Sequence, residues 1–231
     1  MSNTPCAILS WNVRGLNWQA RRTVVREIAD AHRASILCLQ ETKLESWTPA
    51  IVHELGGRRL EGCAFLPATG TRGGVAILWD KAVMTFTTHA IGCFSITGRV
   101  SVLQDNASFW LTTVYGPADD ARKDAFLSEM AHVAPPPGEP WLINGDFDVI
   151  YEARDKNNLN LNRRMMSRFR AAIDTAGLRE IKCKNRRFTW TNKRQDPTMV
   201  CINKVFCNAE WDALFVGERS RNLKFSTQHQ D

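Results

Sequence analysis

Polar side chains that can bind a cation stand at the ends of short apolar runs far apart in the chain. Asn12 ends one such run, Glu41 and Asp146 follow two others, and Gln228-His229 lies close to the last residue. Runs of Val, Ile, Leu and Trp predict buried strands, so a polar residue at the end of each emerges at the rim of a sheet. Carboxylate and amide oxygens gathered at one rim predict a site for a divalent cation and a phosphate group.

The segments that must position these residues form two successive groups. Residues 7–11 and 35–40 are predicted strands, and residues 18–33 between them have apolar side chains at helical spacing. Strands joined by short turns, one of them at Asp105-Asn106, follow as in an antiparallel meander: residues 73–79, 83–88, 94–103 and 109–115. The second group has predicted helices at 120–133 and 166–176 and predicted strands at 140–146, 188–191, 199–206 and 222–225.

Each group mixes strands with helices that can cover them. The most economical arrangement is an α/β fold in which two mixed, mainly antiparallel sheets pack face to face with helices outside, giving four layers. A chain of 231 residues with 44% hydrophobic content can bury a substantial core, and it contains no linker long enough to separate two cores. We therefore expect a single domain spanning residues 1–231.

Charge and cysteine content limit the partners and the compartment. The net charge of +6 is compatible with a nucleic-acid partner and equally with none, and the basic stretches 163–170 and 182–187 are more typical of solvated faces than of a specific site. Seven cysteines without a CxxC pair favour a reducing compartment. No signal sequence or membrane-spanning run is evident. We expect an intracellular monomer, nuclear or cytoplasmic and not secreted, with no membrane partner.

Five short motifs follow one another along the chain: Ser10-Trp11-Asn12-Val13-Arg14-Gly15-Leu16, Gln40-Glu41-Thr42-Lys43, Gly73-Gly74-Val75-Ala76-Ile77, Val114-Tyr115-Gly116-Pro117 and Gly145-Asp146-Phe147. Their order resembles that of the endonuclease/exonuclease/phosphatase superfamily, from Ile8 to His229. The block 187–192, followed by Pro197 and Val205-Phe206, resembles the endonuclease domain of plant non-LTR (LINE-type) retrotransposons. The resemblance implies a DNase I-like four-layer sandwich, Mg²⁺ (or Mn²⁺) as cofactor, and cleavage of phosphodiester bonds in DNA.

The resemblance also implies roles for individual residues. Glu41 and Asn12 are the expected metal ligands, with Gln228 beside them. Asp146 is expected to orient or deprotonate the attacking water. Tyr115 can donate its hydroxyl to a phosphate oxygen, and His229 can contact the scissile phosphate. All but Gln228 have a structural alternative: a capping or turn residue for Glu41, Asn12 and Asp146, an ordinary strand-end aromatic for Tyr115, and a residue of a loose tail for His229.

Other residues are candidates for holding nucleic acid. Lys43, Arg72 and Arg14 can line a groove for the DNA backbone, where positive charge gains affinity from counterion release. Trp190 can stack on a base. Its alternation with Phe188 favours packing in the core instead, as in an ordinary strand.

Three positions depart from the family pattern inside the expected site. Asp148 stands in place of an asparagine, Asn203 in place of the aspartate that orients His229, and Gln228 in place of an aspartate near the metal. A like charge about 4 Å from a phosphate costs about 4 kcal/mol at an effective dielectric of about 20. The family pattern also continues as a closing strand after the histidine, so we expect that strand to be missing here and His229 to be less firmly placed.

Three functions remain open from the sequence. The first is a metal-dependent DNA endonuclease whose partly degenerate site, which includes Asp148 and Asn203 among its catalytic positions, retains slow nicking. The second is a catalytically dead remnant that binds nucleic acid or a protein partner. The third keeps the fold but acts on sugar phosphates or lipids, which the block 188–192 argues against.

Overall fold

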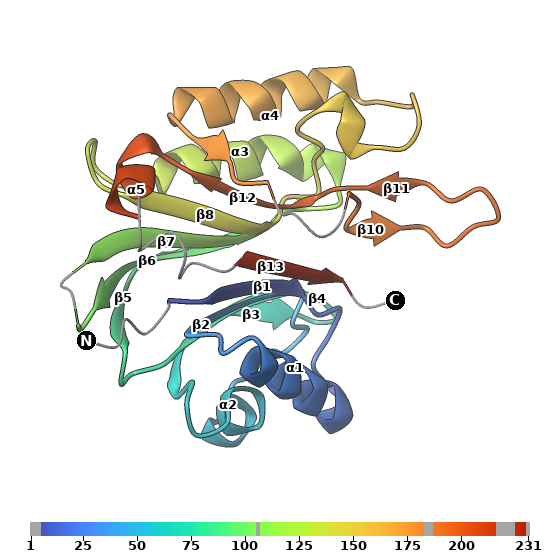
Figure 1. Ribbon diagram of the computed structural model, residues 1–231. Coiled ribbons are helices and arrows are strands. Elements are labelled where there is room, and N and C mark those ends of the chain that lie inside the picture. Colours follow the sequence, from blue (N-terminus) through green and yellow to red (C-terminus); the bar gives the residue numbers. More distant parts are fainter. Residues whose placement is uncertain (1–5, 105–106, 183–186, 216–224, 230–231) are drawn as a thin grey trace.

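The computed structural model describes residues 6–104, 107–182, 187–215 and 225–229, the last of these by their backbone alone. Two β-sheets pack face to face, with one pair of helices outside each sheet (Figure 1). This arrangement is the four-layer α/β sandwich predicted from the sequence.

The first sheet has the strand order β13-β1-β2-β4-β3. β1 pairs in parallel with both β2 and β13, whereas β4 pairs antiparallel with β2 and with β3. The parallel register places Asn12 beside both Gln40 and His229, so three strands end at the same edge. The strands span Ile8–Asn12 (β1), Ile36–Gln40 (β2), Gly62–Thr69 (β3), Arg72–Trp79 (β4) and Phe225–His229 (β13).

The second sheet has the strand order β5-β6-β7-β8-β12-β9. Among the described strands of this sheet, only β7 and β8 pair in parallel, which brings Tyr115 beside Asp146. β12 pairs antiparallel with β8, so Asn203 at its start also lies beside Asp146. The strands span Met84–Ile91 (β5), Ser95–Val102 (β6), Ser108–Tyr115 (β7), Trp141–Asp146 (β8), Arg179–Glu180 (β9) and Asn203–Cys207 (β12).

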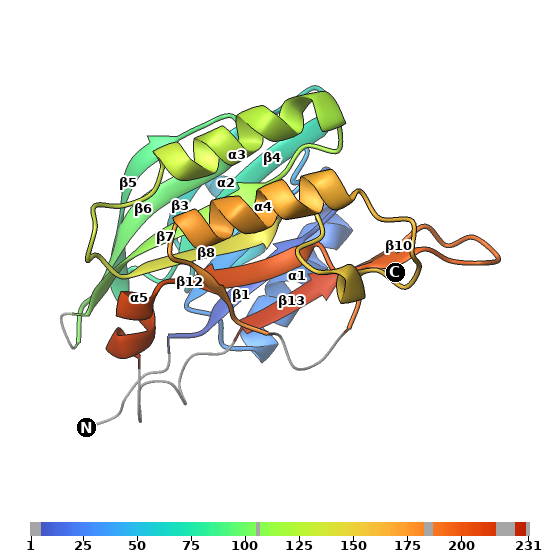
Figure 2. The ribbon, with the colours of Figure 1, turned by 90° about the horizontal axis from the view of Figure 1, so that it is seen from above.

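The helices cover the two outer faces. α1 (Gln19–Ala31) and α2 (Pro49–Gly56) lie under the first sheet, and α3 (Lys123–His132) and α4 (Arg163–Thr175) run side by side across the second (Figure 2). Local sequence sets where they begin, because Thr48 and Asn162 accept hydrogen bonds from backbone N–H groups of the first turns of α2 and α4. Every helix in the described ranges is too short or too polar to span a bilayer.

Three apolar clusters correspond to the three interfaces between layers. One fills the space between the sheets, one joins the first sheet to α1 and α2, and one joins the second sheet to α3 and α4. The outer cluster of the second sheet is built largely of phenylalanines, with Phe147 in ring contact with Phe126, Phe169 and Phe206. Because Phe147 directly follows Asp146, this packing fixes the backbone that carries a predicted catalytic residue.

Several predicted boundaries differ from the structure. The predicted strand 199–206 is two strands, β11 (Met199–Val200) and β12, because the N–H of Cys201 turns away to the carbonyl of Asp155 at 2.7 Å. β11 pairs instead with β10 (Trp190–Thr191) in a separate hairpin (Figure 1). The last strand is 225–229 rather than 222–225; residues 222–224 and the predicted turn at Asp105-Asn106 lie outside the described residues. α2, β3, β9 and the short helix α5 (Ala209–Leu214) were not predicted.

Gly145 is required by the close approach of β8 to β7. Its φ is +138°, and a Cβ there meets the carbonyl oxygen of Val114 at 2.1 Å. We expect Gly145→Ala to lower the free energy of unfolding by more than about 3 kcal/mol, because both backbone strain and overlap with main chain must be relieved. The matched control is Gly138→Ala, where φ is +85° and no atom lies within 4 Å; it should lose only about 1 kcal/mol. Equal losses in urea unfolding would contradict this explanation.

Candidate active site

The predicted residues converge where the two sheets meet at one edge. Nδ2 of Asn12 donates to Oδ2 of Asp146 at 2.7 Å, which joins the end of β1 in one sheet to the end of β8 in the other. These two residues are 134 positions apart in the chain. The backbone N–H of Asp148 donates to the other oxygen of the same carboxylate at 3.1 Å. Asp146 is therefore held by two donors, with its carboxylate orientation fixed.

Glu41 and Tyr115 lie beside this pair. The Tyr115 hydroxyl hydrogen-bonds to Glu41, and burial together with the charges of Glu41, Asp146 and Asp148 raises the pKa of Tyr115 well above its usual value. The hydroxyl therefore stays protonated and can donate a hydrogen bond. Nζ of Lys43 pairs with Oε1 of Glu41 at 3.1 Å.

Burial and mutual repulsion change the acidity of the two aspartates. Burial raises the pKa of Asp146 to about 6, opposed by the hydrogen bonds from Asn12 and Asp148. Burial, with added repulsion from Asp146, raises the pKa of Asp148 to about 7, opposed by Lys123. Nζ of Lys123 lies 3.9 Å from Oδ2 of Asp148 and donates to its carbonyl at 3.0 Å. Burial therefore disfavours the charged form of both carboxyls more than the neighbouring cations favour it.

Four of the residues at this edge have left-handed backbone conformations. Arg14, Glu41, Lys43 and Asp148 have φ between 49° and 55°. Such conformations cost non-glycine residues about 1–3 kcal/mol each and persist where the surrounding structure enforces them, often at functional sites. Here they turn the backbone just past the strand ends. The side chains therefore take directions that a continued strand would not give them.

A groove runs past Glu41 and Tyr115 along the first sheet. Its volume is about 740 Å³, and it lies between the β3–β4 turn and residues 116–122. Lys43 and Arg72, two of the residues predicted to hold a DNA backbone, line it, and so does Arg122, which was not among them. Arg14 does not line the groove; its charge lowers the pKa of Asp146. The basic residues are therefore divided between the groove and the surroundings of Asp146.

Trp190 is not in the core, contrary to the packing expectation. It is half-buried on β10 and belongs to none of the three apolar clusters. The buried residue of the block is Thr189, whose Oγ1 accepts from the backbone N–H groups of Ile202 at 2.9 Å and Asn203 at 3.1 Å. The alternation of Phe188 and Trp190 therefore predicted burial for the wrong face of this segment.

The three divergent positions lie at or beside the cluster. Asn203 pairs in register with Asp146 and is only 4% exposed, and its Nδ2 and Oδ1 have no hydrogen-bond partner among the described residues. The backbone of Gln228 lies beside Trp11, and that of His229 beside Asn12. The structure does not describe the side chains of Gln228 and His229.

The residues present fit a divalent cation. No three His, Cys, Asp or Glu side chains among the described residues stand close enough to hold a metal by themselves. Mg²⁺ does not need such a set, because it commonly keeps several waters and binds one or two carboxylates. Glu41 borders the groove. The amide oxygen of Asn12 accepts the backbone N–H of Arg14 at 3.1 Å and has a second lone pair for a cation. Burial raises the pKa values of Asp146 and Asp148, and a bound cation would favour their charged forms.

The family model described as "Endonuclease/Exonuclease/phosphatase family" matches residues 9–221. The chain belongs to the endonuclease/exonuclease/phosphatase family. Among curated protein sequences, none matches this family member significantly.

Solved structures share the fold of this endonuclease/exonuclease/phosphatase protein at low sequence identity. AP endonuclease LMAP from Leishmania major is 15% identical with a TM-score of 0.67, over 87% of this chain and 78% of that one. The endonuclease domain of TRAS1, a telomere-specific non-LTR retrotransposon, is 14% identical with a TM-score of 0.63, over 88% and 85%. D. rerio TDP2, solved with a single-strand DNA product, is 18% identical with a TM-score of 0.59, over 87% and 82%.

The effect of Asp148→Asn on stability tests the cost of burying a charged carboxylate at this position, independently of any enzymatic activity. The pKa of Asp148 is about 7 in the folded protein and about 3.8 in the unfolded chain. Its contribution to stability is therefore fully present below about pH 3.8 and is lost as the pH rises through about 7. The variant should therefore be more stable than the parent at pH 8 by at least about 1 kcal/mol, and nearly equal to it at pH 4. Urea unfolding at both pH values measures this. Exposed Asp196→Asn is the control, and an equal gain from it would contradict the explanation.

Proposed function

We propose that this protein hydrolyses phosphodiester bonds of DNA as a Mg²⁺-dependent nicking endonuclease with a partly degenerate site. The observation that carries the proposal is the 2.7 Å hydrogen bond between Asn12 and Asp146, because it unites both sheets at the rim where Glu41 and Tyr115 also meet. Family membership and the fold of nucleic-acid enzymes such as LMAP support the reaction class.

The chain's own residues divide the chemistry between them. Glu41 and the amide oxygen of Asn12 would hold Mg²⁺, which when bound stabilises negative charge on the phosphoryl and leaving oxygens. Asp146, fixed by two donors, orients the attacking water and takes its proton. Tyr115, kept protonated, would transfer its hydrogen bond from Glu41 to a phosphate oxygen when the substrate binds. His229 contacts the scissile phosphate from the end of β13.

DNA is the substrate that the groove favours. Lys43, Arg72 and Arg122 line it next to Glu41 and Tyr115, where a polyanionic backbone gains from their charge. The fold shared with the TRAS1 endonuclease domain supports the same substrate class. Asp148 and Asn203 slow the reaction, since one adds a charge near the phosphate and the other removes the carboxylate expected to orient His229.

A plasmid-nicking assay tests the proposal. Supercoiled plasmid should convert slowly to the open-circular form with Mg²⁺ or Mn²⁺, and a chelator in excess should reduce conversion to that of an empty-vector preparation. Nicking that survives chelation, or none above the empty-vector level with either metal, would overturn it.

A second candidate function is binding of nucleic acid without cleavage. The unpaired, buried amide of Asn203 favours it, because the position beside Asp146 then lacks the charged partner that the family uses. Salt-dependent DNA binding without nicking supports this function. Loss of binding even at low salt excludes it and leaves a protein partner as the remaining form of this candidate.

A further inference from the structure

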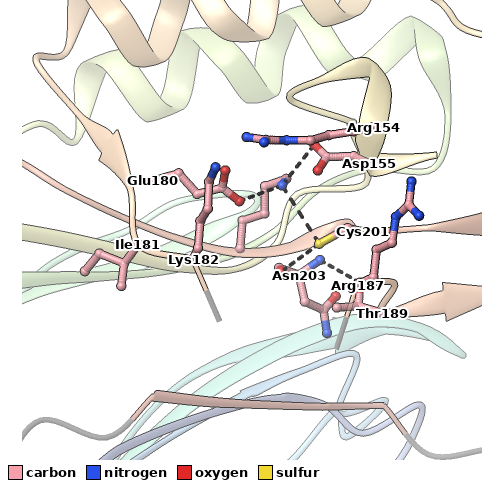
Figure 3. A pocket seen from close by; sticks show the side chains of 10 residues that line it. Arg154, Asp155, Glu180, Ile181, Lys182, Arg187, Thr189, Cys201 and Asn203 are labelled. Carbon is pink, nitrogen blue, oxygen red and sulfur yellow. Dashed lines mark hydrogen bonds and ion pairs between the residues drawn. The ribbon is translucent and has the colours of Figure 1, made fainter. Parts of the chain in front are cut away.

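A second pocket lies next to the catalytic cluster, on the far side of β12. Its volume is about 190 Å³, enough for a phosphate group and several waters. Arg154, Lys182, Arg187 and Lys204 line it together with two acidic residues and Asn203 (Figure 3). The pocket is separate from the groove that passes Glu41, and none of its lining residues is a proposed metal ligand.

The acidic residues of this pocket are partly compensated by Lys204. Nζ of Lys204 pairs with Asp155 at 2.9 Å and with Glu180 at 2.8 Å, and the Lys204 side chain is 1% exposed. Oδ2 of Asp155 also accepts the backbone N–H groups of Tyr151 and Glu152. The pocket is lined by four cationic side chains and two carboxylates, so its balance of charge favours an anion.

Two rim cations have no described carboxylate partner. Lys182 and Arg187 are exposed and line the pocket, and neither forms an ion pair with a described residue. Arg187 lies over the Phe188 ring, with its guanidinium carbon 5.0 Å from the ring centroid. Arg154 is paired with Glu152. Lys182 and Arg187, the two described residues of a stretch that the sequence predicted to be a solvated face, thus border a concave site.

Asn203 supplies an independent sign of a ligand. Asn203 is one of the lining residues, and its buried amide has neither a donor nor an acceptor partner in the described part of the chain. Leaving a buried amide unpaired costs about 1–3 kcal/mol. An oxygen-rich ligand that accepts from Nδ2 removes the part of that cost that belongs to the donor.

We propose that this pocket binds a backbone phosphate next to the scissile one on the same nucleic-acid strand, an inference that rests on the proposed function. Asn203 and Asp146 are direct partners across β12 and β8, so the two phosphate positions are neighbours. Lys182 and Arg187 supply the charge and Asn203 the hydrogen bond. The bound strand would then extend from the groove beside Glu41, past Asp146, into this pocket.

The test compares the double variant Lys182→Gln/Arg187→Gln with the control Arg58→Gln/Lys81→Gln. The control removes the same charge from exposed positions outside both sites. Fluorescence anisotropy with a short single-stranded DNA, at several salt concentrations and with Ca²⁺ in place of Mg²⁺, gives the affinity. We expect the pocket variant to bind at least about tenfold more weakly at low salt, with a salt slope smaller by about 1.4, since each lost phosphate contact on a single strand lowers the slope by about 0.7. The control should match the parent.

A second measurement separates this inference from the proposed nuclease activity. Inorganic pyrophosphate added to the ¹⁵N-labelled full chain should shift the side-chain amide signals of Asn203 in the parent and not in the pocket variant. Shifts in the parent without any nicking keep the pocket and reject the nuclease. Nicking, with DNA affinity and amide shifts unchanged by the pocket substitutions, keeps the nuclease and overturns the pocket.

Discussion

The triple variant Asp148→Asn/Asn203→Asp/Gln228→Asp is expected to nick DNA faster than the natural chain, by up to about 10⁴-fold. Asn203→Asp is expected to provide most of the gain. The unpaired amide of Asn203 lies beside Asp146, and a carboxylate in its place can orient His229 and stabilise the protonated form of that histidine. Asp148→Asn replaces a repelling carboxylate with an amide that can donate to a phosphate oxygen. Initial rates of plasmid nicking under excess Mg²⁺ measure the effect.

Single substitutions show how much each position contributes to the faster nicking. Asp148→Asn should act mainly by removing repulsion, whereas exposed Asp196→Asn, which changes the net charge equally, should leave the rate unchanged. Asn203→Asp should raise the rate while weakening DNA binding, because it also places a carboxylate in the pocket lined by Lys182 and Arg187. A triple variant no faster than the natural chain would show that these three positions do not limit the reaction.

Asp146→Asn and Glu41→Gln should each abolish measurable nicking, with losses of at least about 10²–10⁴-fold. Asparagine keeps the size of Asp146 and can still pair with Asn12, but it cannot take a proton from water. Glutamine removes the charge with which Glu41 would hold the cation. Exposed Glu45→Gln is the matched control for Glu41. Full activity in either site variant would assign the nicking to another protein in the preparation.

The sequence predicted the convergence of Asn12, Glu41 and Asp146 because each ends a strongly apolar strand. Parallel pairing within each sheet, and face-to-face packing of the two, then bring those ends together. The missed elements carry weaker signals. α2 has only eight residues, and β3 contains Pro67, which argues against a strand because it cannot donate to the ladder.

Other features of the site depend on contacts that no local pattern encodes. Lys123 lies in a predicted helix, yet its partner Asp148 is 25 residues away. The left-handed conformations of Glu41 and Asp148 follow from packing around the site and not from residue type. Thr189 was within a recognised block, but its role became visible only once β12 was placed against it. The prediction that Trp190 packs in the core was wrong for the same reason, because a local pattern does not show which distant segments cover a strand.

The most direct test of the central claim is a crystal structure of the protein soaked in Mn²⁺, with data collected for anomalous scattering. The account predicts an ion bound between the carboxylate of Glu41 and the amide oxygen of Asn12, with Asp146 facing the same cavity. A structure at saturating Mn²⁺ with no ion there, and with the carboxyl groups of Glu41 and Asp146 directed away from each other, would contradict it.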